Sequence, residues 1–169
     1  MTMKLLKIKS FQETLHKGYC GPAVLKMILE FYGIRKSEKE LAILAGTSLN
    51  AGTDEKKMQQ VLRDFGLTTA LKDNASLNDI KRYLNKSTPV IVDWFTRGRK
   101  DDSDSAIADG HYSIAVGLDK QHIYLQDPEI GKLRKIKRKD FLLVWFDFTG
   151  TILRSNKQCY LRRLIAVHQ

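Results

Sequence analysis

The chain has 169 residues, of which 43% are hydrophobic and 28% charged, and its formal net charge at pH 7 is +10. This length and balance predict one globular domain, residues 1–169, and exclude a disordered or fibrous chain. No stretch approaches the roughly 20 consecutive apolar residues of a membrane span. Residues 1–9 also lack the apolar region of a signal peptide. We therefore expect a cytoplasmic protein without a transmembrane segment.

The predicted elements, in chain order, follow from apolar periodicity and from capping residues. Four helices are expected, over residues 20–33, 37–46, 53–66 and 76–84. Strands or extended segments are expected over residues 4–11, 67–71, 90–95, 111–118, 122–126, 133–136 and 160–167, with a short helix or turn at 141–145. Residues 97–110 are polar and charged, and form a candidate lid or substrate-facing loop. The order of helices before strands predicts an α+β fold, with an N-terminal helical half packed on a C-terminal antiparallel sheet.

Cys20 lies at the start of the first predicted helix, directly before Gly21 and Pro22. The free N–H groups and the macrodipole at a helix N-terminus favour the thiolate, which is the reactive form of cysteine. Gly21 removes side-chain bulk beside the sulfur, so a substrate backbone can come close. An isolated cysteine is more often a small buried residue. Its interpretation as a nucleophile therefore depends on a base supplied by another part of the chain.

The candidate base is His111, which opens an apolar strand directly after Gly110. At that place an imidazole can project into a cleft while the strand fixes its backbone. Asp127 ends the next predicted strand. If the two strands pair as an antiparallel hairpin, the start of the first lies beside the end of the second. Asp127 would then orient the imidazole and support its cationic form, while Asp127-Pro128 also initiates a turn.

Gln12 is the candidate oxyanion donor, because its side-chain amide can act together with the backbone N–H of Cys20. Cys20 and Cys159 are the only two cysteines and have no close ligand partners, so no zinc-site spacing is present. No glycine-rich phosphate loop is present either. The sequence therefore predicts neither a metal nor a cofactor.

The densest run of charge covers residues 132–139, where six of eight residues are lysine or arginine. Such a run is typical of a solvated strand edge or loop. Its charge attracts anionic partners, for example an acidic peptide or an anionic membrane surface. No zinc finger or RNP motif accompanies it, so we expect no specific nucleic-acid partner.

These motifs together resemble the C39-like peptidases, a family of papain-like cysteine peptidases. The resemblance covers residues 12–150 and rests on these blocks: Tyr19-Cys20-Gly21-Pro22-Ala23, Gly110-His111-Tyr112 with Val116-Gly117, Asp127-Pro128 with Gly131, and Phe141 with Trp145. It implies a papain-like fold and a peptide or protein substrate. It also implies that Cys20 is the nucleophile, His111 the base and Asp127 the third member of a triad.

The family places an oxyanion glutamine six residues before its cysteine, and this sequence departs from that spacing. Thr14 holds the expected position, whereas Gln12 lies eight residues before Cys20. A two-residue insertion in the intervening loop would bring Gln12 back to the site. The family's best-known members cleave leader peptides after a double glycine, in domains fused to an ABC transporter.

The residues and the resemblance predict a cysteine peptidase or amide hydrolase. One alternative is a catalytically degenerate fold that binds peptides, which the displaced glutamine favours. A second alternative is an acyl transferase that uses the same triad and differs only in its acceptor. Nucleic-acid binding through net charge alone is the weakest interpretation, because it would be non-specific and steeply salt-dependent.

Overall fold

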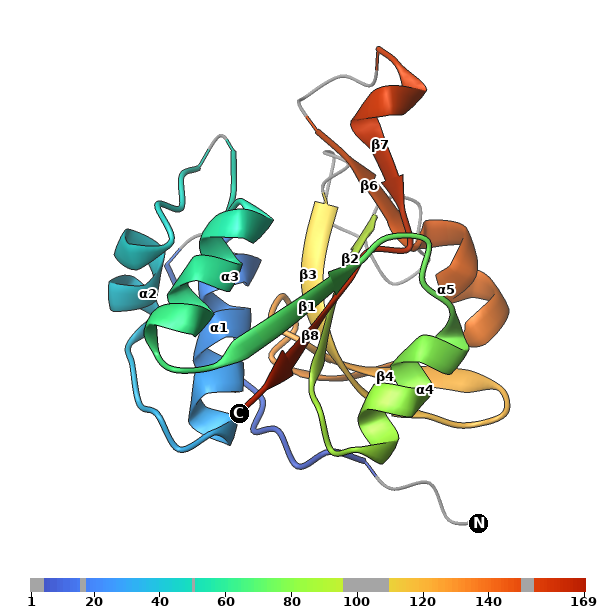
Figure 1. Cartoon of the computed structure of the whole chain (residues 1–169), viewed down its shortest axis with the longest axis horizontal. Helices are drawn as coiled ribbons and strands as arrows, with labels where there is room; N and C mark the ends of the chain where they lie inside the picture. Colours follow the sequence, from blue (N-terminus) through green and yellow to red (C-terminus); the bar gives the residue numbers. More distant parts are fainter. Residues whose placement is uncertain (1–4, 16–17, 50, 96–109, 150–153) are drawn as a thin grey trace.

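The computed structural model describes residues 5–15, 18–49, 51–95, 110–149 and 154–169, which form an α+β fold (Figure 1). Its elements follow the chain in this order: α1 Cys20–Phe31, α2 Glu38–Leu44, α3 Glu55–Asp64, β1 Thr68–Lys72, α4 Leu77–Asn85, β2 Val90–Phe95, β3 Gly110–Leu118, β4 His122–Asp127, β5 Lys132–Lys137, α5 Arg138–Val144, β6 Phe146–Phe148, the 3-10 turn η1 Asn156–Gln158, β7 Cys159–Leu161 and β8 Leu164–His168. Across these described ranges, no helix is long and apolar enough to cross a membrane.

An antiparallel sheet of six strands forms the centre, in the order β1-β8-β2-β3-β4-β5. Successive residues of a strand point to opposite faces of the sheet. Ile91 of β2 therefore joins a core cluster with α1, α2 and α3, whereas Val90, Val92 and Trp94 join a second cluster with α4 and α5. Figure 1 shows these two groups of helices on opposite sides of the sheet. The predicted α+β packing is confirmed, and α4 and α5 add a third layer.

The first helix is buried because apolar residues recur along most of its surface. Val24, Leu25, Ile28 and Leu29 are all fully buried. Gly33 ends the helix with a φ of +81°, a left-handed conformation that glycine adopts without a Cβ penalty. The predicted start and stop of this helix are therefore confirmed. The helix fixes Cys20 at its N-terminal end, against the central sheet.

The next helices are capped as their sequences predict. The hydroxyl of Ser37 accepts the N–H of Glu40, and the carboxylate of Glu40 accepts the N–H of Ser37, which is a complete capping box. Asp54, rather than Thr53, caps α3, since its carboxylate accepts the N–H groups of Lys56 and Lys57.

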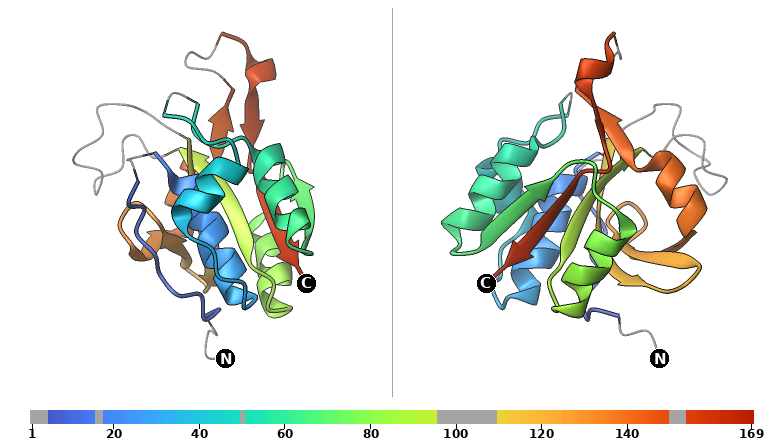
Figure 2. Two further views of the ribbon diagram at one scale, coloured as in Figure 1. Left: turned by 90° about the vertical axis from the view of Figure 1, so that its left-hand side faces the viewer. Right: turned by 45° about the vertical axis from the view of Figure 1, so that its right-hand side comes forward.

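The single strand predicted over residues 160–167 is wrong, because the chain breaks it in two. Arg162 has a φ of +49° and separates β7 from β8. Its N–H donates to the carbonyl of Trp145 at 2.9 Å. β8 enters the main sheet between β1 and β2, whereas β7 pairs with β6 in a separate two-stranded ribbon that was not predicted. Figure 2 shows this ribbon extending beyond the main body in both views.

Two other predictions concern the lead-in and the polar loop. Residues 5–10 form no strand, but they run alongside β3, where the N–H of Leu6 donates to the carbonyl of Val116 at 2.8 Å. The alternative of an extended lead-in is therefore the correct one. The candidate lid at residues 97–110 lies outside the described residues, except for Gly110, which begins β3.

Candidate active site

The nucleophile candidate is fixed by the packing of α1 against β3. Cys20 is the first residue of α1, and its Tyr19 N-cap makes no side-chain capping bond. The sulfur accepts the backbone N–H of Tyr112 at 3.5 Å, so β3 holds the thiol in place. Only 5% of Cys20 is exposed. The predicted position of this cysteine at a helix N-terminus is confirmed.

The imidazole of His111 lies beside this sulfur and is itself only 6% exposed. The side chain of Cys20 interacts with the imidazole and helps to raise its pKa. Nε2 of the imidazole lies 2.7 Å from Oδ1 of Asp127. The edge of the Trp94 ring system covers the imidazole, with the ring centroids 5.8 Å apart. Since Nε2 faces the carboxylate, Nδ1 is the nitrogen available to the thiol.

The carboxylate of Asp127 is held in turn by two further groups. The backbone N–H of Glu129 donates to its Oδ1 at 3.0 Å. Nε of Arg134 forms an ion pair with its Oδ2 at 2.5 Å. Arg134 also pairs with the carboxylate of Glu129 at 3.2 Å, and only 5% of the Arg134 residue is exposed. The basic run was interpreted as a solvated edge, and β5 is indeed an edge strand, but Arg134 is its buried exception.

The contacts between His111 and Asp127 shift the pKa values of both side chains. Burial alone would lower the pKa of His111, but the charge and hydrogen bond of Asp127, with a smaller contribution from Cys20, raise that pKa well above 6.5. Burial opposes the ionised form of Asp127 as well, yet His111 and Arg134 lower the pKa of Asp127 to about 2. Both shifts favour the charged forms of the pair, an imidazolium and a carboxylate.

The side chain of Gln12 contacts the turn that follows Asp127. Gln12 is exposed, and its Nε2 donates to the carbonyl of Glu129 at 3.2 Å. Thr14, at the position where the resemblance expects a glutamine, binds the carboxylate of Glu38 on α2 through its N–H and its hydroxyl. Gln12 therefore contacts the turn after Asp127, and the oxyanion role expected for it stays a prediction.

Glu13 is a half-buried residue near the site that the sequence motifs do not identify. Its N–H donates to the carbonyl of Pro128 at 2.9 Å, and its Oε1 accepts the N–H of Gly18 at 3.4 Å. Burial raises the pKa of Glu13, and the positive charge of His111 lowers it only in part. Its Oε2 is buried, without a hydrogen bond to any residue that the structure describes. One feature of the sequence could have indicated Glu13: it is an acidic residue only seven positions before Cys20.

Three side chains of the site could ligate a cation by distance alone. The ligand atoms of His111, Asp127 and Glu129 lie within 4.8 Å of one another. Arg134, however, pairs with both carboxylates and supplies the positive charge that a cation would bring. The arrangement is therefore suited to orienting an imidazole rather than to holding a metal.

The comparison with known proteins agrees with this geometry. Residues 6–152 match the model of the Peptidase_C39 like family. The chain belongs to this family. The Lactococcin-A transport/processing ATP-binding protein LcnC of Lactococcus lactis subsp. lactis is 32% identical over 143 residues. That match covers 82% of this chain but only 18% of the relative. This C39-like chain thus matches a small part of the length of that relative.

Solved structures of C39 peptidase domains share the fold. The peptidase domain of Streptococcus ComA, a bi-functional ABC transporter in a quorum sensing pathway, superposes with a TM-score of 0.69 at 20% identity. The match covers 95% of this chain and 98% of that domain. A double glycine motif protease from an AMS/PCAT transporter, in complex with a leader peptide, gives a TM-score of 0.64 at 17% identity, over 99% of this chain and 97% of that one. The papain-like α+β fold expected for this C39-like chain is confirmed.

Proposed function

We propose that this C39-like chain is a cysteine peptidase or amide hydrolase, in which Cys20, His111 and Asp127 form the catalytic triad. One observation carries the proposal: the buried imidazole of His111 is hydrogen-bonded to the carboxylate of Asp127, and the next residue, Tyr112, contacts the thiol of Cys20 through its N–H. A nucleophile next to a base that is oriented by a third group is the arrangement needed for covalent acyl transfer.

The reaction follows from the charges of the site. The imidazolium of His111 stabilises a thiolate at Cys20, which attacks the carbonyl carbon of an amide and forms a C–S bond. Nδ1 of His111 then gives its proton to the departing nitrogen, and the C–N bond breaks. A water molecule next attacks the thioester while His111 accepts its proton, and the C–S bond breaks. Asp127 holds the ring orientation through both steps.

The oxyanion of each tetrahedral intermediate needs hydrogen-bond donors. The backbone N–H of Cys20 is one, because the first N–H groups of a helix have no intrahelical partner. Gln12 is the predicted second donor. Its Nε2 carries two N–H groups, of which one donates to the carbonyl of Glu129 and leaves the other for the oxyanion. The carboxyl of Glu13 interacts electrostatically with both His111 and Asp127.

The proposed substrate is a peptide or protein. Support comes from the family and from the double glycine motif protease, which was crystallised with a leader peptide. We also propose that residues 1–169 act as one cytoplasmic domain. Both core clusters share the same central sheet, which supports a single unit.

The direct test is hydrolysis of a mixed peptide library by the purified protein in H₂¹⁸O, read by mass spectrometry. We expect new C-termini that carry one ¹⁸O atom with the wild type and with Cys159→Ser, and none with Cys20→Ala. The Cys159 variant is the matched control, because it removes the other cysteine, which lies on β7. Circular dichroism confirms that each variant is folded.

Two results would replace the proposal with one of its alternatives. Peptides that bind to the wild type but are never cleaved would indicate a degenerate peptide-binding module. Products joined to an added amine such as glycinamide, without any hydrolysis, would indicate an acyl transferase. Equal cleavage by Cys20→Ala and the wild type would contradict any role of this thiol.

A further inference from the structure

A second charged feature lies at the end of the central sheet that is remote from the triad. The turn between β3 and β4 and the junction of β5 with α5 flank an open hollow of about 500 Å³, lined by Lys120, Gln121, His122, Lys137, Arg138 and Lys139. His111 is the second residue of β3, whereas this hollow lies beyond the far end of that strand, roughly 20 Å away at about 3.3 Å per residue. The feature is therefore separate from the proposed active site.

The walls of this hollow are held together by the backbone. The N–H of Arg138 donates to the carbonyl of Gln121 at 2.8 Å, which ties the start of α5 to the β3–β4 turn. The guanidinium of Arg138 lies 3.5 Å from the carbonyl of Asp119 and 3.4 Å from that of Lys120. The cationic side chains therefore belong to two segments that are hydrogen-bonded to each other, the β3–β4 turn and the start of α5.

The lining carries four permanent positive charges, from Lys120, Lys137, Arg138 and Lys139, and no carboxylate. Within the described ranges, the three lysines form no ion pair. Asp119 is the acid of this turn. The N–H groups of Gln121 and His122 and the hydroxyl of Tyr124 lower the pKa of Asp119 to about 2.

The carboxylate of Asp119 lies 3.5 Å from Nδ1 of His122 and, through its other contacts, stabilises the turn. The like charges that line the hollow repel one another. A multivalent anion bound between them adds attractive interactions that outweigh this repulsion.

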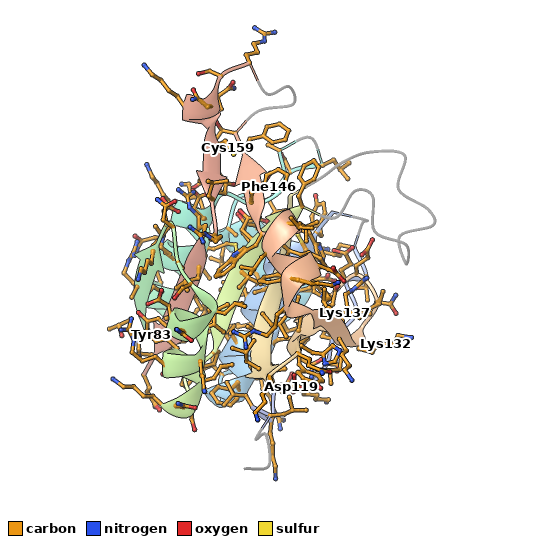
Figure 3. All side chains as sticks on the ribbon, turned by 90° about the vertical axis from the view of Figure 1, so that its right-hand side faces the viewer. Tyr83, Asp119, Lys132, Lys137, Phe146 and Cys159 are labelled. Atoms are coloured by element: carbon orange, nitrogen blue, oxygen red, sulfur yellow. The ribbon has the colours of Figure 1, made fainter. Side chains whose placement is uncertain are left out.

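Shape and donor types narrow the class of anion. A hollow of this volume matches the size of small-molecule sites, which run from about 300 to 1,000 Å³. Nearly every group in the lining is a hydrogen-bond donor, including the amide of Gln121 and the fork of Arg138, which suits phosphate oxygens. Single-stranded nucleic acid is disfavoured, because the lining has no aromatic platform other than His122. Figure 3 shows Lys132 and Lys137 of β5 on one side of the molecule, with Asp119 below them.

We propose that this hollow binds a small anion that carries a chain of phosphates, such as an inorganic oligophosphate or the phosphate chain of a nucleotide. Lys137 and Lys139 would contact the phosphates from β5 and α5, and Lys120 would close the site from the β3–β4 turn. Binding here requires no catalysis, so it is independent of the proposed peptidase function.

The test is isothermal titration of the wild-type protein with inorganic triphosphate, ATP and citrate at fixed ionic strength. The double variant Lys137→Gln/Lys139→Gln removes two exposed lysines of the lining. Its matched control is Lys56→Gln/Lys57→Gln, which removes the same charge from exposed positions on α3. We expect triphosphate and ATP to bind alike, at least tenfold more weakly in the first variant and within twofold of wild type in the control. Cys20→Ala should bind like the wild type.

Three results would overturn the proposal. Equal losses in the two double variants would show that only net charge attracts the anion. Citrate binding as tight as that of triphosphate would remove the preference for phosphate. The absence of saturable triphosphate binding at millimolar concentration would exclude the site altogether. Amide chemical shifts of residues 120–122 and 137–139 should move on binding, and shifts confined to other regions would place the anion elsewhere.

Discussion

Replacing Asp127 with asparagine keeps the size of the side chain and removes the charge between His111 and Arg134. The pKa of Asp127 is about 2 instead of its ordinary 3.8, which corresponds to about 2 kcal/mol of folding free energy at roughly 1.36 kcal/mol per pH unit. The variant also leaves the buried guanidinium of Arg134 with a weaker partner, and breaking a buried pair costs about 3–5 kcal/mol. We therefore expect Asp127→Asn to lower the free energy of unfolding by about 3 kcal/mol at pH 6.

The loss should depend on pH with a definite sign. The pKa of Asp127 is lowered, so its contribution is present above pH 3.8 and disappears as the pH falls through about 2. The pKa of His111 is raised, so its contribution is present below pH 6.5 and disappears as the pH rises through the folded value. The difference between wild type and variant should therefore be largest between about pH 4 and 6.5.

Urea denaturation at pH 3, 5 and 6 measures this difference, and a thermal melt gives a decrease of about 10 °C as an independent check. The double variant Asp127→Asn/Arg134→Met should regain part of the lost stability, because it removes the uncompensated cation. A difference that is the same at all three pH values, or a double variant that loses the sum of both single effects, would refute the reasoning from a buried ion pair.

Three smaller changes test other parts of the structure. Gly21→Ala should destabilise the fold by about 1–3 kcal/mol, since its Cβ would lie 2.3 Å from Oγ1 of Thr53, and an unchanged melting temperature would contradict that contact. Ser37→Ala should cost about 1 kcal/mol in urea denaturation by removing the cap of α2, and a loss below ~0.3 kcal/mol would exclude the capping box as a source of stability. Glu13→Gln should lower the pKa of His111, as followed by NMR of its ring protons, and an unchanged titration would place the Glu13 carboxyl away from the imidazole.

Much of the fold could be predicted because local signals and tertiary packing agree. The apolar repeat of the first helix, its glycine stop and the cap at Ser37 are readable from sequence, and the structure repeats them. The split at Arg162 could not be predicted, because the residues on both sides favour strand. Only the pairing of β7 with β6 and of β8 with β1 and β2 separates them.

Some residues of the candidate site could likewise be predicted from local patterns, and others could not. The placement of His111 beside Asp127 followed from one antiparallel hairpin, which is a short-range inference. The positions of Gln12 and Glu13 depend on how the lead-in crosses the turn after Asp127, and no local pattern specifies that crossing. The role of Arg134 could not be predicted for a related reason. A run of basic residues does not indicate which of them is buried, and here it is Arg134.

The central claim is that His111 activates the sulfur of Cys20. Its most direct test is the rate of alkylation by iodoacetamide at pH 6 in a Cys159→Ser background, with and without His111→Ala, read by mass spectrometry of the Cys20 peptide. We predict rapid modification of Cys20 when the histidine is present and a decrease of at least tenfold in rate when it is replaced. Equal rates in the two folded proteins would contradict the account.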